Sequence, residues 1–153
     1  MGPETIHADM FVSRVLVPMF KMMENAKHRK DNDIIHDLKY LLVTFHDTNL
    51  SNLLRFLKYF DTYGFDKFVR FSSSLRFELL RDKKSLDKSD KQYRMRVVFD
   101  NEDIKLPFCS DTICDYTEFK EYLYKNLIFD YNEVEKYCSG GMGDAYVNEL
   151  KFK

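Results

Sequence analysis

An apolar run that ends in a histidine and an aspartate constrains this chain more than any other feature. Residues 38–45, LKYLLVTF, are rich in leucine, valine and aromatic side chains, and they predict a buried strand. His46 and Asp47 follow directly, and an amphipathic helix is expected from Thr48 to Tyr59. A strand that brings an imidazole and a carboxyl group to a helix N-terminus predicts a phosphate site.

Two further segments predict helices, because their apolar side chains recur at steps of three and four residues. They are residues 8–27 and 117–127, and Pro18 is expected to kink or split the first of them. The apolar stripes of the three predicted helices are Phe11, Val12, Val15, Leu16, Met19, Phe20 and Met23; Leu50, Leu53, Leu54, Leu57 and Phe60; and Phe119, Tyr122, Leu123 and Leu127.

A β-hairpin is expected between the second and third helices. Residues 74–80 and 93–99 alternate between apolar and polar side chains, and the charged residues 81–91 join them. Residues 61–67, with Gly64, predict a turn, and residues 107–115 predict a loop. The order helix, strand, helix, strand, strand, helix predicts a single α/β domain over residues 1–153, with a mixed sheet and flanking helices.

The composition excludes several classes of partner. The 24 basic and 25 acidic residues balance, so no strong field favours nucleic acid. The densest basic cluster, residues 27–30, precedes Asp31 and Asp33, and a solvated helix end is expected there. No apolar run approaches the ~20 residues of a membrane span. Residues 1–7 lack the layout of a signal peptide.

Three cysteines leave the redox state open. Cys109, Cys114 and Cys138 fit no zinc pattern, because such a pattern needs four Cys or His ligands in paired short spacings. Cys109 and Cys114 would close a small loop in an oxidising compartment, and all three would stay free thiols in a reducing one. No metal or other cofactor is expected.

Four blocks in order resemble one family. They are LLVTFHDTNLSNLL at 41–54, FSSSLRFEL at 71–79, YRMRVVFDN at 93–101, and LPFC at 106–109 with Cys114 and Phe119 after it. Together they are similar to the C-terminal portion of the histidine acid phosphatases, the group that includes acid phosphatases and phytases. The resemblance implies a partial histidine-phosphatase-like α/β fold and a secretory or lysosomal compartment.

The resemblance also implies roles for two residues. In that family one histidine attacks phosphorus and forms a phosphohistidine, which water then hydrolyses. Carried over, His46 would hold the phosphoryl oxygens and Asp47 would be the general acid that protonates the leaving alcohol. The ligand would be a phosphate monoester or another anion. A local Cys109–Cys114 bridge is implied as well, and the cysteine similar to Cys138 bonds to an earlier half of the domain.

The attacking histidine of that family has no counterpart in this sequence. It stands in an Arg-His-Gly motif, and none of the four histidines here precedes a glycine. Turnover by these residues alone is therefore not expected. The chain would be part of a split phosphatase, a fragment from an incomplete gene model, or a non-catalytic structural or interaction subunit derived from the family.

Two readings stand beside the catalytic one. An ordinary structural role would have His46 close a buried strand while Asp47 caps the next helix. The ten Tyr and fourteen Phe are generous for a core of this size, and a sheet without its central strands would expose edges and apolar surface. Both features predict a protein partner or self-association.

Overall fold

A computed structural model describes residues 3–27, 39–64, 69–82 and 89–130 of the chain. These residues form an α/β arrangement, as the order of predicted elements indicates, with four α-helices and an open sheet of four strands. The helices and the hairpin share one hydrophobic core, which extends from Val12 to Leu127. Cys138 and residues 139–143 lie outside the described residues.

A long hairpin is the centre of the sheet. Strand β1 (Leu75–Arg81) pairs antiparallel with β2 (Tyr93–Phe99) along its whole length, which confirms the predicted hairpin. Two short strands, β3 (Glu102–Asp103) and β4 (Ile113–Asp115), also pair with β2. All these pairs are antiparallel, so the prediction of a mixed sheet is wrong for the described strands. The prediction of a loop over 107–115 is wrong only at its end, where residues 113–115 form β4.

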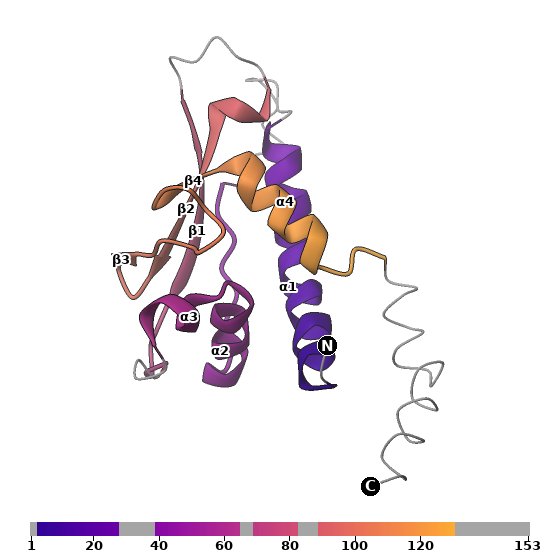
Figure 1. The fold of residues 1–153 in the computed structure, drawn as a ribbon, viewed down its shortest axis with the longest axis vertical. Coiled ribbons are helices and arrows are strands. Elements are labelled where there is room, and N and C mark those ends of the chain that lie inside the picture. Colours follow the sequence, from indigo (N-terminus) through magenta and orange to yellow (C-terminus); the bar gives the residue numbers. More distant parts are fainter. Residues whose placement is uncertain (1–2, 28–38, 65–68, 83–88, 131–153) are drawn as a thin grey trace, which may run out of the picture.

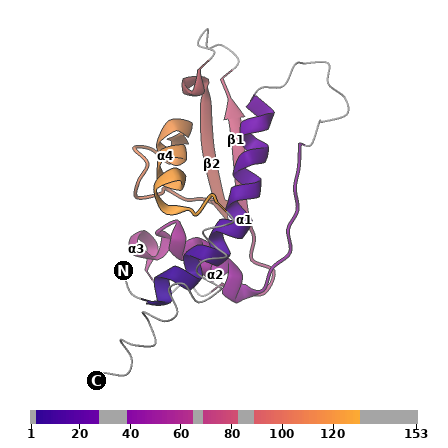
Figure 2. The ribbon, with the colours of Figure 1, turned by 90° about the vertical axis from the view of Figure 1, so that its right-hand side faces the viewer.

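Two of the helices cover one face of this hairpin, and the other two lie at its end (Figures 1 and 2). Helix α1 spans Pro3–Lys27 and α4 spans Tyr116–Asn126, and both lie on the same side of β1 and β2. Alternation along β2 points Tyr93, Met95, Val97 and Phe99 toward the core. The opposite face is charged, and ion pairs there link Arg96 to Glu78 and Asp103.

The predicted helical stripes are confirmed where they were expected. Their members are buried or packed against the core in all three helices. Helix α1 continues through Pro18, so the predicted split is wrong. A proline removes one backbone hydrogen bond, and the burial of Leu16, Val17 and Phe20 around it outweighs that loss.

One predicted helix is divided in two. Helix α2 (Asp47–Phe56) ends near Leu57, and the short α3 (Tyr59–Tyr63) follows Lys58. Lys58 has a φ of 57°, a left-handed conformation that interrupts the helical hydrogen bonds. The break turns Tyr59 toward the sheet, where its ring lies 5.2 Å from that of Phe99.

The predicted strand at 38–45 is the main correction to the expected fold. Leu38 lies outside the described residues, and residues 39–46 form neither helix nor strand. No described strand pairs with them, and a strand exists only where a neighbour supplies its hydrogen bonds. They run as an extended segment alongside the core and lead into α2 (Figure 2).

Candidate functional site

The two residues expected to act on phosphate stand at the start of α2. His46 has an extended backbone, with φ of −76° and ψ of 159°, and it occupies the position just before the first helical residue, Asp47. Both side chains are exposed. The structure therefore brings the imidazole and the carboxyl group to one helix N-terminus, as the sequence predicts, but on an open surface.

Much of the hydrogen-bonding capacity of this helix start is already used. The carboxylate Oδ1 of Asp47 accepts from the backbone N–H of Thr48 at 2.7 Å. The backbone carbonyl of His46 accepts from the N–H groups of Asn49 and Leu50, at 3.1 and 3.2 Å. The carboxylate of Asp47 thus satisfies one orphan amide, which is part of the ordinary structural role. His46 does not close a buried strand, and its side chain does not cap the helix.

The segment before His46 exposes apolar side chains in both directions. Tyr40 is 69% exposed and Leu42 is 71% exposed, while Leu41 and Val43 between them are about half exposed. Phe45 makes the main aromatic contact of the segment, edge-on to Phe11 of α1 at 6.2 Å between ring centroids. Successive residues of an extended chain point to opposite sides, so neither side of this segment is covered.

A pocket of about 380 Å³ lies elsewhere, between α1 and the residues that follow α4. Arg14, Lys21, Pro18 and Phe129 are among the side chains that line it, and neither His46 nor Asp47 does. The hydroxyl of Ser13, which also lines it, accepts a hydrogen bond from the backbone N–H of Ile128. This contact fixes the chain after α4 against α1.

The expected solvated helix end contains a buried charge instead. The Lys27 side chain is only 3% exposed, and its Nζ lies 2.7 Å from Glu24 and 2.5 Å from Asp90. It also lies 4.4 Å from the centre of the Tyr116 ring, and Lys120 pairs with both acids. The prediction for Lys27 is therefore wrong, and residues 28–33 of that cluster lie outside the described residues.

Burial and hydrogen bonding set the protonation of this cluster. Burial raises the pKa of Glu24, but hydrogen bonds from Lys27 and Tyr116 outweigh it, so its pKa lies below the ordinary value. Burial also raises the pKa of Asp90, but hydrogen bonds from Lys27 and Lys120 outweigh it, so this pKa too lies below its ordinary value. Burial, and then the hydrogen bond to Glu24, raises the pKa of Tyr116. The cluster joins α1 and α4 to the 3-10 turn that holds Asp90 (Asp90–Gln92), as a network of ions at neutral pH.

Sequence reasoning missed a carboxylate beside the cysteines. Cys109 and Cys114 form the local disulfide that the resemblance implies, and both are buried. The carboxylate of Glu118 lies beside it, 3.8 Å from the sulfur of Cys114. Helical spacing does not reveal this contact, because Cys114 lies in β4 and Glu118 lies in the first turn of the helix that follows it.

No family model, curated protein or solved structure matches this chain at a significant level. Among the described residues, no helix has the length and apolar character needed to cross a bilayer.

Proposed function

We propose that this chain supplies the general acid and a phosphate-binding histidine of a histidine acid phosphatase-like phosphate monoester hydrolase. In this proposal His46 holds the phosphoryl oxygens and Asp47 protonates the leaving alcohol. An imidazolium offsets negative charge on the transferred group, and an adjacent carboxylic acid neutralises the alkoxide as it leaves. The helix dipole of α2 adds a favourable field for an anion at its N-terminus.

The observation that carries this proposal is the exposed apolar segment that ends at His46. A run that is apolar on both sides is typical of a central strand in a sheet covered on both faces. Residues 40–45 have that pattern, are extended, and lack a neighbouring strand among the described elements. A further polypeptide segment that pairs with them would also build the walls of a cleft around His46 and Asp47.

The nucleophile is the part of the reaction that these residues do not supply. None of the four histidines stands in the Arg-His-Gly motif that the resemblance requires. Asp47 and His46 by themselves would bind an anion but would form no covalent intermediate. The proposal therefore assigns the attacking group to residues outside this sequence.

Hydrolysis of a generic aryl phosphate at acidic pH tests whether the nucleophile lies outside this sequence. The chain alone, His46→Ala and Asp47→Asn are all expected to release no more phenol than buffer does. Activity in the unmodified chain that is lost in both variants would contradict the assignment, because the complete machinery would then lie within these 153 residues. Circular dichroism of each variant verifies that it is folded.

A non-catalytic interaction subunit is the second candidate. The exposure of both His46 and Asp47 favours it over a complete enzyme. In this case the extended segment serves only to recruit another strand or a second copy of the chain.

Self-association through the segment is a measurable consequence of the second candidate, where a second copy of the chain is the partner. We expect Tyr40→Lys combined with Leu42→Lys to raise the apparent dissociation constant of self-association at least about tenfold. Burial of a large apolar side chain contributes about 1.5–3 kcal/mol, and about 1.4 kcal/mol is tenfold in affinity. Light scattering over a concentration series measures the change.

A matched control for this test is Phe71→Lys. Phe71 is 99% exposed but lies outside the segment, so its loss removes a comparable apolar surface from another place. An equal effect of Phe71→Lys, or a chain that is monomeric at every concentration, would count against association through residues 40–45.

A further inference from the structure

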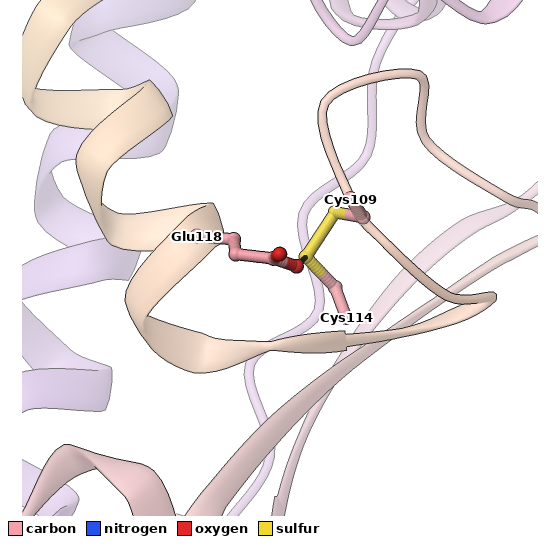
Figure 3. Close-up of side chains that lie close together, drawn as sticks. All are labelled: Cys109, Cys114 and Glu118. Carbon is pink, nitrogen blue, oxygen red and sulfur yellow. Dashed lines mark hydrogen bonds between the residues drawn. A yellow bond between two sulfur atoms is a disulfide. The ribbon is translucent and has the colours of Figure 1, made fainter.

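The disulfide and the glutamate beside it place three metal-ligating groups together. Cys109 lies in the loop before β4, Cys114 lies in β4, and Glu118 lies in the first turn of α4. Their two sulfurs and a carboxylate oxygen all lie within 4.8 Å of one another. Figure 3 shows the Glu118 side chain pointing from α4 toward the two sulfur atoms.

Hydrogen bonds hold the carboxylate in this position. Oε2 of Glu118 accepts from the backbone N–H and from the hydroxyl of Ser110, both at 3.1 Å. Ser110 follows Cys109, so these contacts tie the carboxylate to the loop that carries the first sulfur. A disulfide has no proton to donate to a carboxylate, so in the bridged form the donors to Glu118 come from Ser110 and the carboxylate lies against the sulfurs without a hydrogen bond to them.

We propose that the reduced form of this group is a zinc site, with Cys109, Cys114 and Glu118 as ligands and water in the fourth position. Two thiolates and a carboxylate belong to the ligand set that Zn²⁺ prefers. A tetrahedral site with Zn–S near 2.3 Å and Zn–O near 2.1 Å separates its ligand atoms by about 3.5–3.8 Å. The distance of 3.8 Å between the Cys114 sulfur and Glu118 Oε2 already lies at the upper end of that range, and cleavage of the S–S bond would let the two sulfurs move apart to it.

Formation of the site requires a balanced exchange. A dithiol reductant gives two electrons and two protons to the S–S bond and becomes a disulfide itself. The two resulting thiols then release their protons as the thiolates bind Zn²⁺. The thiolates would be buried, because Cys109 is 5% exposed and Cys114 is 1% exposed, and the ion compensates their charge.

The disulfide and the metal ion would both hold the loop at Cys109 against β4. The metal ion would also hold the start of α4 there, because Glu118 is one of its ligands. Bridge formation suits an oxidising compartment and metal binding suits a reducing one, so the local structure would persist in both. The zinc site lies at the start of α4 and shares no residue with the proposed phosphate site at the start of α2.

Titration of the full chain with Zn²⁺ and with Co²⁺ tests the proposal, with Cys138→Ser in every sample. The reduced chain is expected to bind one ion, and Co²⁺ should give the visible bands of a tetrahedral site together with thiolate charge-transfer absorption. The oxidised chain should bind none. If reduction unfolds the chain, Zn²⁺ should restore its circular dichroism spectrum. Failure to bind, or failure to restore the fold, would overturn the proposal.

Two variants show whether Glu118 binds the ion or whether the two thiolates bind it alone. Glu118→Gln is expected to weaken Zn²⁺ binding by about tenfold or more, since even outer partners of zinc ligands contribute 10–100-fold. Glu121→Gln removes an exposed carboxylate from the same helix and should leave the affinity unchanged. Equal affinity of the two variants would contradict the role of Glu118.

Discussion

Phe119→Ala is expected to lower the free energy of unfolding by about 3–5 kcal/mol, the range for a fully buried phenylalanine. Phe119 is 0% exposed, and its ring lies 6.2 Å from that of Phe77 and 6.3 Å from that of Phe108. It therefore joins α4 to β1 and to the loop before β4. Urea denaturation followed by circular dichroism measures the change.

Glu121→Ala is the control for this substitution. Glu121 is exposed on the same helix, and alanine favours helix at both positions, so the control should stay within about 0.5 kcal/mol of the unmodified chain. A loss below about 1 kcal/mol for Phe119→Ala would show that α4 does not pack on the hairpin as described.

Removal of both acids around Lys27 is the second large effect. We expect Glu24→Gln combined with Asp90→Asn to cost about 3 kcal/mol of stability at neutral pH, because a buried ammonium loses its ionic partners. The Lys27 side chain is 3% exposed, while the two acids are 23% and 31% exposed. Asp103→Asn, which breaks an exposed ion pair with Arg96, is the control and should change stability little.

The same cluster should make stability depend on acid pH. The pKa values of Glu24 and Asp90 lie below their ordinary values of 4.5 and 3.8, so the folded chain binds fewer protons there than the unfolded chain does. Their contribution is present above the ordinary values and is lost as the pH falls below them. Stability measured between neutral pH and about pH 3 should therefore fall less steeply in the double variant. Identical pH profiles would contradict the ionic network.

The elements that the sequence predicted correctly are those whose pattern is local, even where their partners, such as Tyr116 and Phe129 against Phe20, lie far along the chain. The hairpin of β1 and β2 carries its own alternation and its own pairing, and the stripes of α1, α2 and α4 face a core that these same residues form. Residues 38–45 look like a strand by composition, but a strand needs a neighbour, and composition does not supply one. The left-handed backbone at Lys58 and the short pairing of β4 with β2 depend on tertiary contacts.

The candidate site was predicted in its residues but not in its surroundings. His46 and Asp47 do meet at the start of a helix, as the local pattern indicates. Their exposure is set by which strands lie beside residues 40–45, and that information lies outside the local sequence. Lys27 and Glu118 were missed for a related reason, because Asp90 and Ser110, which contact them, are brought near by the fold.

Titration with inorganic phosphate, followed in the imidazole NMR signals at mildly acidic pH, tests the central proposal most directly. The proposal predicts a saturable shift of the His46 ring and of the Thr48 amide, with the other three imidazoles as internal references. Asp47→Asn should alter the His46 response without abolishing it, and His46→Ala should abolish the shift at Thr48. Equal shifts of all four imidazoles, or none at His46, would contradict a phosphate site at the start of α2.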